Sequence, residues 1–286
     1  MKQILLGVSI TALLFSCTGE KKEQNNTTTD TTKVSSDTNS QASAGQVQQT
    51  VDFVENLPSP LHVSRIFKKS GLKYVSGLTN KPDAVSTYQS NTGKSLNLGV
   101  YSADLAYTSL NSQTQESVKY FKSIKGISDG LNMGSIFTNN QLIARFEKNL
   151  GNQDSLIRIM AELQMESDML LKETQRYDVV FLSFTGAWVE SMYLASQIND
   201  KQANPDLAKR IGQQAATLSK LIKLLDSFKT EVSVQNLITE LSGIQTSLDK
   251  LVEGDKSSSD PAFQKHLKDD LTPKIVALRK RIISEA

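Results

Sequence analysis

The sequence predicts an all-α protein, a bundle of about eight to ten helices arranged in antiparallel hairpins after a disordered N-terminal tether. Through most of residues 51–286, apolar residues recur at spacings of three and four, which is the period of one face of an α-helix. Strand signals are scarce, because alternating runs of β-branched residues are few. We therefore expect one helical domain over 51–286, with a possible internal boundary near residue 200.

The first 17 residues have the pattern of an export signal. Lys2 supplies a positive start, Ile4–Phe15 is mostly apolar, and the run ends at Cys17. An ordinary secretory signal or a membrane helix is the alternative, but the stretch is too short to cross roughly 30 Å of hydrocarbon. Cys17 is the only cysteine in the chain, which excludes an internal disulfide and a cysteine-based metal site.

The end of this segment, Leu14-Phe15-Ser16-Cys17, resembles the lipobox of bacterial lipoproteins, although Phe15 is bulkier than the usual residue. The resemblance implies that Cys17 is diacylated, released by the lipoprotein signal peptidase, and acylated again on its new amino group, with palmitate as a typical chain. Such acyl chains would hold the protein on a membrane of the cell envelope. Thr18 stands where an inner-membrane retention signal often has aspartate, so we expect the outer membrane, on its periplasmic or surface face.

Residues 18–50 have the composition of a disordered tether. They are mostly Thr, Ser, Asn, Gln, Lys, Glu and Asp, and Val34 and Val47 are their only large apolar residues. Such a segment cannot bury enough apolar surface to offset the entropy of ordering. Within it, Asp30-Thr31-Thr32 resembles the O-glycosylation acceptor of envelope proteins in the Bacteroidetes group, which implies a glycan on Thr31.

Charge excludes one class of partner. The chain has 32 Lys and Arg against 30 Asp and Glu, a formal net charge of +2. Nucleic acids and anionic lipid surfaces are bound by clustered basic faces, and no basic cluster is apparent. We therefore expect no nucleic-acid partner, and membrane attachment through the lipid alone.

The helices of the first half follow from caps and periodicity. Short helices are predicted over Pro60–Lys69 and Pro82–Gln89. In the predicted Asp154 helix, Met160, Leu163 and Ser167 fall on the side expected to be buried. The longer helices of this half are predicted over Lys94–Leu110, Gln113–Gly130, Asn140–Leu150, Asp154–Lys172 and Tyr177–Ile198.

The second half is predicted as a hairpin followed by a last helix. Apolar residues recur helically from Leu207 to Leu225, and again from Leu237 to Leu251, and the short polar break between them favours an antiparallel pair. Asp260-Pro261 supplies a cap and a first-turn proline for the last helix. Pro273 lies inside that helix and should kink or restart it.

Two helices are apolar on nearly all sides, and each carries one carboxylate. Asp104 lies within residues 96–107 and Glu190 within 179–194. Small residues Gly99, Ala103 and Ala106 form a seam where another helix could approach closely. The second helix resembles a membrane span by hydropathy, but Glu190 and its other polar residues favour a buried core helix. Any site is expected between the two helices, at Tyr101, Asp104, Tyr107, Trp188, Glu190 and Tyr193.

Three roles remain open for the two carboxylates. They line a pocket for a small polar or cationic ligand, they act as an acid and base in a hydrolase, or they only fix helix register through hydrogen bonds. The structural role has the greatest weight. No catalytic serine motif, phosphate loop or Glu-x-x-His pair occurs, so we expect no metal, no cofactor and no enzyme activity.

Residues 96–107, the lipobox and the polar tether together resemble uncharacterised helical lipoproteins of the Bacteroidetes group. The resemblance implies a fold and a location but no activity. The preferred functional hypothesis is a lipid-anchored helical scaffold that binds an envelope protein partner. A small-ligand binding or sensing protein is the alternative, and a carboxylate-dependent hydrolase is the second alternative.

Overall fold

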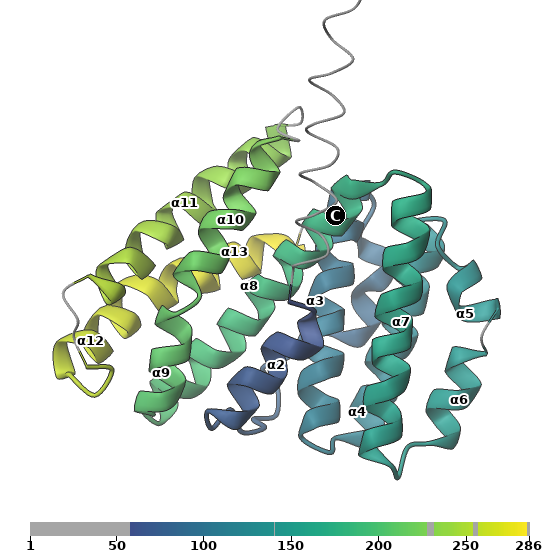
Figure 1. Cartoon of the computed structure of the whole chain (residues 1–286), viewed down its shortest axis with the longest axis horizontal. Coiled ribbons are helices and arrows are strands. Elements are labelled where there is room, and N and C mark those ends of the chain that lie inside the picture. The colour runs from purple at the N-terminus through teal and green to yellow at the C-terminus, as the bar shows by residue number, and fades with distance from the viewer. Residues whose placement is uncertain (1–57, 140, 228–231, 254–256, 285–286) are drawn as a thin grey trace, which may run out of the picture. The chain divides into compact units, whose positions relative to one another are not determined.

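The computed structural model describes residues 58–139, 141–227, 232–253 and 257–284, and these residues are helical with no strand among them (Figure 1). The predicted all-α class is thus confirmed. The predicted signal segment, the tether, and the modification sites Cys17 and Thr31 lie outside the described residues. All described residues belong to one compact unit, and the boundary allowed near residue 200 falls at the end of a long helix.

Two central helices, α3 (Asn91–Leu110) and α8 (Tyr177–Lys201), make the most extensive contact of any two elements. Glycines permit this close approach. A Cβ atom on Gly99 would lie 1.7 Å from the Ser183 carbonyl oxygen, and one on Gly186 would lie 1.8 Å from that of Leu96. The small-residue seam predicted on α3 is therefore where α8 packs.

By length and composition α8 passes as a membrane-spanning helix, but 89% of its most apolar window is buried inside the protein. The helices around it supply the apolar surroundings that lipid would otherwise provide. The prediction of a buried core helix is confirmed for this segment.

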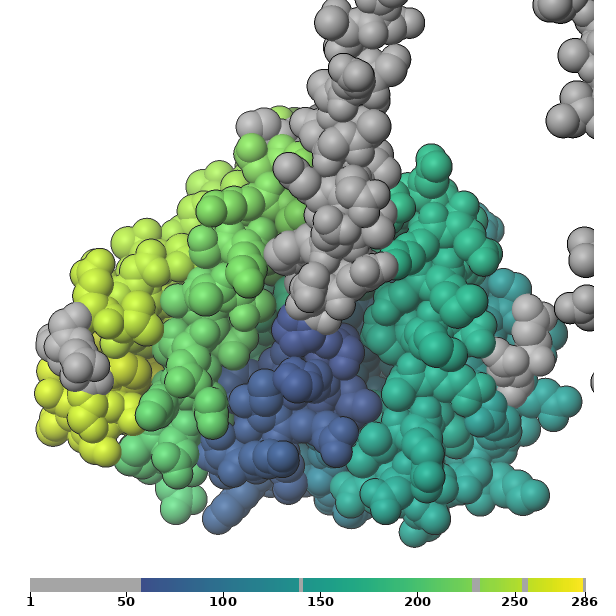
Figure 2. Space-filling model, viewed as in Figure 1, coloured from purple at the N-terminus to yellow at the C-terminus, as the bar shows by residue number. Residues whose placement is uncertain are grey.

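The remaining helices of the first half either contact α3 or pack on the helices that do. They are α2 (Pro60–Lys69), α4 (Thr114–Gly130), α5 (Ser135–Asn139), α6 (Leu142–Lys148) and α7 (Gln153–Glu173). The Asn152 side chain caps α7 by accepting from the Ser155 amide at 3.0 Å, which satisfies a donor that the first turn leaves free. In the space-filling view, α2 lies at the surface with α7 on one side and α9 on the other (Figure 2).

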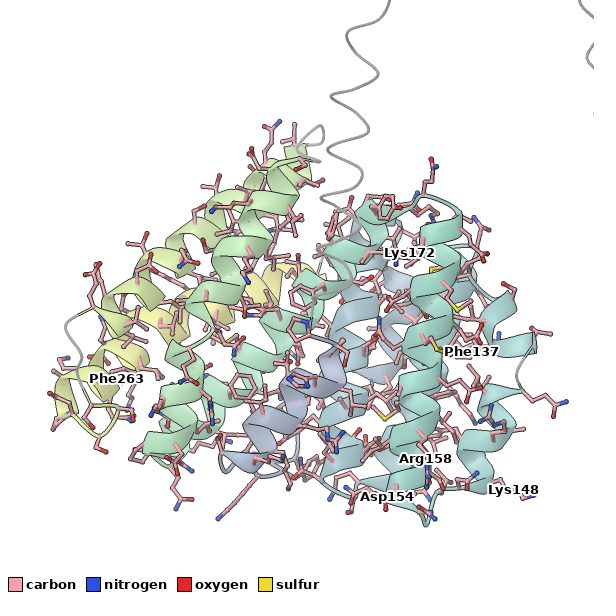
Figure 3. The ribbon with its side chains drawn as sticks, viewed as in Figure 1. Phe137, Lys148, Asp154, Arg158, Lys172 and Phe263 are labelled. Atoms are coloured by element: carbon pink, nitrogen blue, oxygen red, sulfur yellow. The ribbon has the colours of Figure 1, made fainter. Side chains whose placement is uncertain are left out.

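Aromatic packing holds α5 and α6 against α4. Phe121 of α4 stacks on Phe146 of α6 at a centroid distance of 4.2 Å. It also meets Phe137 of α5, which is labelled in Figure 3, and the two rings pack edge to face at a centroid distance of 5.8 Å. Helix α5 was missed in the sequence because five residues are too few to show a period.

The second half contains α9 (Pro205–Gly212), α10 (Ala215–Asp226) and α11 (Val232–Val252). The predicted pairing of residues 207–225 with 237–251 is observed, mainly as contact between α10 and α11. The first member of that pair is two helices, because the chain turns at Gln213 and Gln214 instead of continuing.

The last predicted helix is α12 (Pro261–His266), a π-helical turn η2 (Leu267–Leu271), and α13 (Thr272–Ser284). Pro273 has no amide hydrogen to bond a carbonyl of the preceding turn. A π turn is a common place for a helix to change register. The predicted disturbance near Pro273 is therefore observed as a wide turn and a new start.

A connecting segment runs between α2 and α3. It includes one 3-10 helix, η1 (Pro82–Thr87), where an α-helix over Pro82–Gln89 was predicted. Gly71 and Gly77 within it have φ angles of 97° and 79°, which side chains with a Cβ atom rarely adopt. The segment contributes backbone groups to the polar cluster described next.

Candidate functional site

The structure brings the two predicted carboxylates together in the protein interior. Asp104 of α3 and Glu190 of α8 both have 0% of their surface exposed. Burial, and then the charge of Glu190, raise the pKa of Asp104 well above its usual range, against the lowering effects of Arg279 and the Asn80 amide. One Asp104 oxygen accepts from that amide at 3.0 Å. The other finds no donor among the described residues, which suits a protonated acid whose hydrogen faces Glu190.

Arg279 of α13 completes this cluster. Its Nε donates to Glu190 Oε2 at 2.8 Å, and its Nη2 donates to Oε1 at 2.9 Å. Nη2 also donates to the Leu78 carbonyl oxygen at 3.2 Å, and the guanidinium lies 4.2 Å from the centre of the Tyr193 ring. A forked pair of this kind is the strongest arrangement for a buried carboxylate. With a proton on Asp104, the cluster is electrically neutral.

Tyrosine hydroxyls attach the connecting segment to this cluster. Tyr101 donates to the Lys81 carbonyl oxygen at 2.7 Å, and Tyr120 donates to that of Asn80 at 2.8 Å. Burial raises the pKa of both hydroxyls, so they remain donors at neutral pH. We call Asp104, Glu190, Arg279, Asn80, Tyr101 and Tyr120 the sealed cluster, because their polar groups bind one another and the backbone.

Tyr107 and Trp188 take structural positions. The Tyr107 hydroxyl accepts from the Val75 amide at 2.7 Å and donates to the Lys73 carbonyl oxygen at 2.9 Å, and burial raises its pKa to about 12. Trp188 is 1% exposed, and its Nε1 has no partner among the described residues. None of the six predicted site residues lines the cavity described below. A ligand role for them stays a prediction.

The hydrolase hypothesis required both carboxylates to face a cleft. Both are instead sealed from solvent, and Glu190 is held by both arms of Arg279. Arg279 itself was missed in the sequence, although a signal exists: it lies on the same helix face as Ile275, Leu278 and Ile282, all buried.

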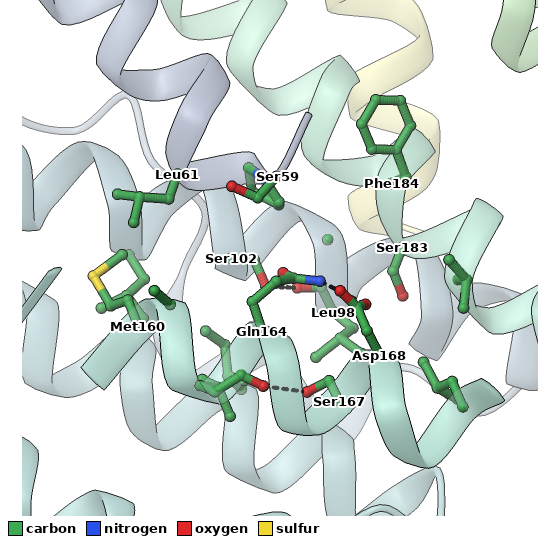
Figure 4. Close-up of a pocket in the computed structure, with 18 of the residues that line it drawn as sticks. Ser59, Leu61, Leu98, Ser102, Met160, Gln164, Ser167, Asp168, Ser183 and Phe184 are labelled. Atoms are coloured by element: carbon green, nitrogen blue, oxygen red, sulfur yellow. Dashed lines mark hydrogen bonds between the residues drawn. The ribbon is translucent and has the colours of Figure 1, made fainter. Parts of the chain in front are cut away.

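A separate cavity of about 120 Å³ opens between the start of α2 and helices α3, α7 and α8 (Figure 4). Apolar side chains, chiefly leucines, form most of its described wall. The sequence prediction named none of its residues as a site. The polar side chains among its lining residues are Ser59, Ser102, Gln164, Ser167, Asp168 and Ser183.

Among the described residues of this wall, Asp168 is the one titratable side chain. Burial raises its pKa to about 6, against the lowering effects of the Gln164 hydrogen bond and the nearby Lys172 charge. The Gln164 amide donates to Asp168 Oδ1 at 2.8 Å, as the close-up shows (Figure 4). Partly buried carboxylates beside an apolar cavity are typical of binding sites.

Metal coordination has no counterpart among the described residues, where no three His, Cys, Asp or Glu side chains gather in one place. Comparison of the sequence and the structure with protein-family models, with curated proteins and with solved structures finds no match.

Proposed function

We propose that this chain is a lipid-anchored, all-helical protein of the bacterial cell envelope that binds a small ligand in the cavity between α2, α3, α7 and α8. The observation that supports this proposal is the cavity itself, a mostly apolar hollow with a few polar groups directed by rigid helices. Small-molecule sites have this composition, with apolar walls for affinity and few polar groups for orientation.

Two variants with a matched control test the ligand site. Ser102 lines the cavity and donates to the carbonyl oxygen four residues before it, so Ser102→Leu fills the space. Ser242 makes the same bond on the exposed side of α11, and Ser242→Leu controls for loss of that bond. Ala161→Phe narrows the cavity from an exposed position, so it tests the site without a buried change.

The measurement is native mass spectrometry of the protein purified from its own membranes, with a thermal-shift screen of small molecules. We expect bound mass and thermal stabilisation in the unaltered chain and in Ser242→Leu. Both should be lost in Ser102→Leu and in Ala161→Phe. Equal binding by all four proteins would contradict the proposed site.

The lipid anchor is supported by the lipobox around Cys17 and has its own test. Metabolic labelling with an alkyne-bearing palmitate analogue should label the natural chain and leave Cys17→Ser unlabelled. Membrane fractionation then reports the envelope location, with outer-membrane fractions expected. Label of equal intensity on Cys17→Ser would contradict the anchor.

A protein-binding scaffold is the second candidate function. Met165 and Met169 lie one turn apart on α7 and are 53% and 50% exposed, and exposed methionines favour adaptable apolar contacts. In-cell cross-linking should attach an envelope protein to α7, and Met165→Glu with Met169→Glu should remove it. An unchanged cross-linked product would exclude this face as the docking surface.

A further inference from the structure

The hydroxyl hydrogens of two cavity serines are already used within their own helices. Ser102 donates to the Leu98 carbonyl oxygen at 2.7 Å, and Ser167 donates to that of Leu163 at 2.8 Å. A hydroxyl has one hydrogen to donate and two lone pairs to accept with. Toward any further partner, these two side chains are therefore acceptors.

Gln164 and Asp168 add more acceptors to the same wall. The Gln164 NH₂ group points at Asp168 Oδ1, 2.8 Å away, and the reversed amide would place two acceptors against each other. The Gln164 carbonyl oxygen is thereby left as an acceptor. Asp168 Oδ2 has no hydrogen bond from a described residue, and an ionised carboxylate only accepts.

Few donors balance this set. Ser59 accepts from the His62 amide at 3.2 Å, and the buried Ser183 oxygen has no partner among the described residues. Both hydroxyls retain a hydrogen, but both are neutral. Lys172 lies near enough for its charge to lower the pKa of Asp168, yet it is not among the lining residues. The described part of the cavity wall thus combines one negative charge with an excess of acceptors.

We infer that the cavity binds the protonated primary amine of an unbranched aliphatic chain, with the ammonium at Asp168 and the chain on the apolar wall. An ammonium group has three hydrogens and no acceptor, which matches Asp168, Gln164 and the serine oxygens. This inference rests on the proposed function, since it names the ligand class of the same site. The amine belongs to a free alkylamine or to a lysine side chain of a peptide.

Volume restricts the ligand further. The cavity measures about 120 Å³, somewhat less than the roughly 150 Å³ of an engineered cavity that holds benzene. A chain of about four carbons with its ammonium is of this size. A quaternary ammonium is too wide at its head and has no hydrogen to donate.

The test is isothermal titration of the purified full-length chain at pH 8 with butylamine and three comparison probes. Butanol has the same length without the charge, tetramethylammonium has the charge without a donor, and Nα-acetyl-lysine methylamide represents a peptide lysine. We expect binding of butylamine well above that of butanol and tetramethylammonium. Tighter binding of the lysine derivative than of butylamine would identify a peptide as the source, and weaker binding a free amine.

Asp168→Asn should weaken butylamine binding about 10- to 100-fold, the usual effect of losing a hydrogen bond to a charged group. Glu166→Gln removes the same charge from α7 at a position outside the cavity wall and should change affinity less than about twofold.

Equal binding of butanol and butylamine, or an unchanged affinity in Asp168→Asn, would overturn the inference about the amine. If the binding of butanol and butylamine to the natural chain is lost in Ser102→Leu, the proposed ligand site still stands. If butylamine binds Ser102→Leu and Ala161→Phe as well as the natural chain, the amine binds elsewhere and both proposals fail. Absence of binding by every amine overturns the inference alone, because native mass spectrometry tests the ligand site independently.

Discussion

The sealed cluster and the cavity are built on the same two helices, α3 and α8, and treat a buried carboxylate in different ways. Asp104 and Ser102 are two residues apart, which is about 200° around a helix, so α3 presents one to the cluster and the other to the cavity. In the cluster, Arg279 and the Asn80 amide donate to the acids, and tyrosine hydroxyls donate to nearby backbone carbonyls. In the cavity, Asp168 receives one hydrogen bond from Gln164 and faces open space.

The difference shows that an unusual pKa does not by itself mark a binding site. Burial raises the pKa of both Asp104 and Asp168. Buried polar groups whose partners all come from the protein stabilise the fold. A carboxylate beside an apolar hollow, with acceptors around it and no charged partner in the wall, leaves bonding capacity for a ligand.

Substitutions in the sealed cluster should have the largest effect on the free energy of unfolding. Arg279→Met leaves the Glu190 carboxylate buried without its cation, and breaking such a pair typically lowers the free energy of unfolding by about 3 to 5 kcal/mol. Urea denaturation measures this. Glu190→Met combined with Arg279→Met should recover most of the loss. Arg281→Met, on the same helix but with its partner Glu240 half-exposed, should cost less than about 1 kcal/mol; an equal loss would show that the cluster is not special.

The next effect is on the helix pair that carries both regions. Gly186→Ala places a Cβ against the Leu96 carbonyl oxygen, so α3 and α8 must separate, at a cost of about 3 kcal/mol in the free energy of unfolding. Ligand binding should weaken too, since both helices wall the cavity. Gly243→Ala is the control, because nothing lies within 4 Å of its added Cβ, and it should stabilise α11 by up to about 1 kcal/mol. If Gly186→Ala unfolded at the same temperature as the natural chain, the close packing of α3 and α8 would be refuted.

The third effect concerns the Asp168 carboxylate, whose ionised form we expect to lower the free energy of unfolding while it provides the charge for amine binding. Its folded pKa of about 6 lies above the ordinary 3.8, so its ionisation opposes folding as pH rises between these values. Asp168→Asn should therefore match the natural chain at pH 3 and exceed its free energy of unfolding by about 3 kcal/mol at pH 8. Denaturation at the two pH values measures this. If Asp168→Asn were less stable than the natural chain at pH 8, other groups of the folded protein would already stabilise the ionised Asp168 carboxylate.

The smallest effect is on amine affinity as a function of pH. Of the wall residues that the structure describes, only Asp168 titrates, and the charge of Lys172 lowers its pKa. One unit below its pKa about a tenth of the carboxylate is ionised, so butylamine affinity should fall about tenfold between pH 8 and pH 5. The amine itself stays charged throughout. Titration of Asp168→Asn should give a flat profile, and a parallel fall in that variant would assign the dependence to another group.

Much of the fold could be predicted because local signals determine where helices begin. Pro60, Pro205 and Pro261 each follow a capping residue, and each begins a helix in the structure. The break between α9 and α10 was not predicted, because its only sequence signal is Gly212 directly before the turn at Gln213 and Gln214, and a lone glycine is a weak stop signal. The apolar pattern continues across it.

The site was only partly predictable, for reasons of distance and context. Asp104 and Glu190 stood out because each interrupts a helix that is apolar all round, and such helices must pack together. Arg279 is 89 residues from Glu190, and no local pattern pairs them. Asp168 lies beside the predicted buried side of its helix, where a carboxylate is usually solvated. The cavity wall beside it also contains residues of α2, α3, α4 and α8, which no local pattern in α7 reveals.

Because α13 supplies Arg279, the buried carboxylates of α3 and α8 gain their cation only after α13 has been synthesised. Synthesis proceeds from the N-terminus, so Asp104 and Glu190 both leave the ribosome before their cation does. Asn97 of α3 has a similar dependence, since its side chain donates to the Ile282 carbonyl oxygen at 2.9 Å. Until α13 arrives, the α3 and α8 pair contains unpaired polar groups and is a poor folding intermediate. We therefore expect stable packing of α3 against α8 only after α13 has docked. A chain cut short before α13 should be degraded by proteases faster than the full chain.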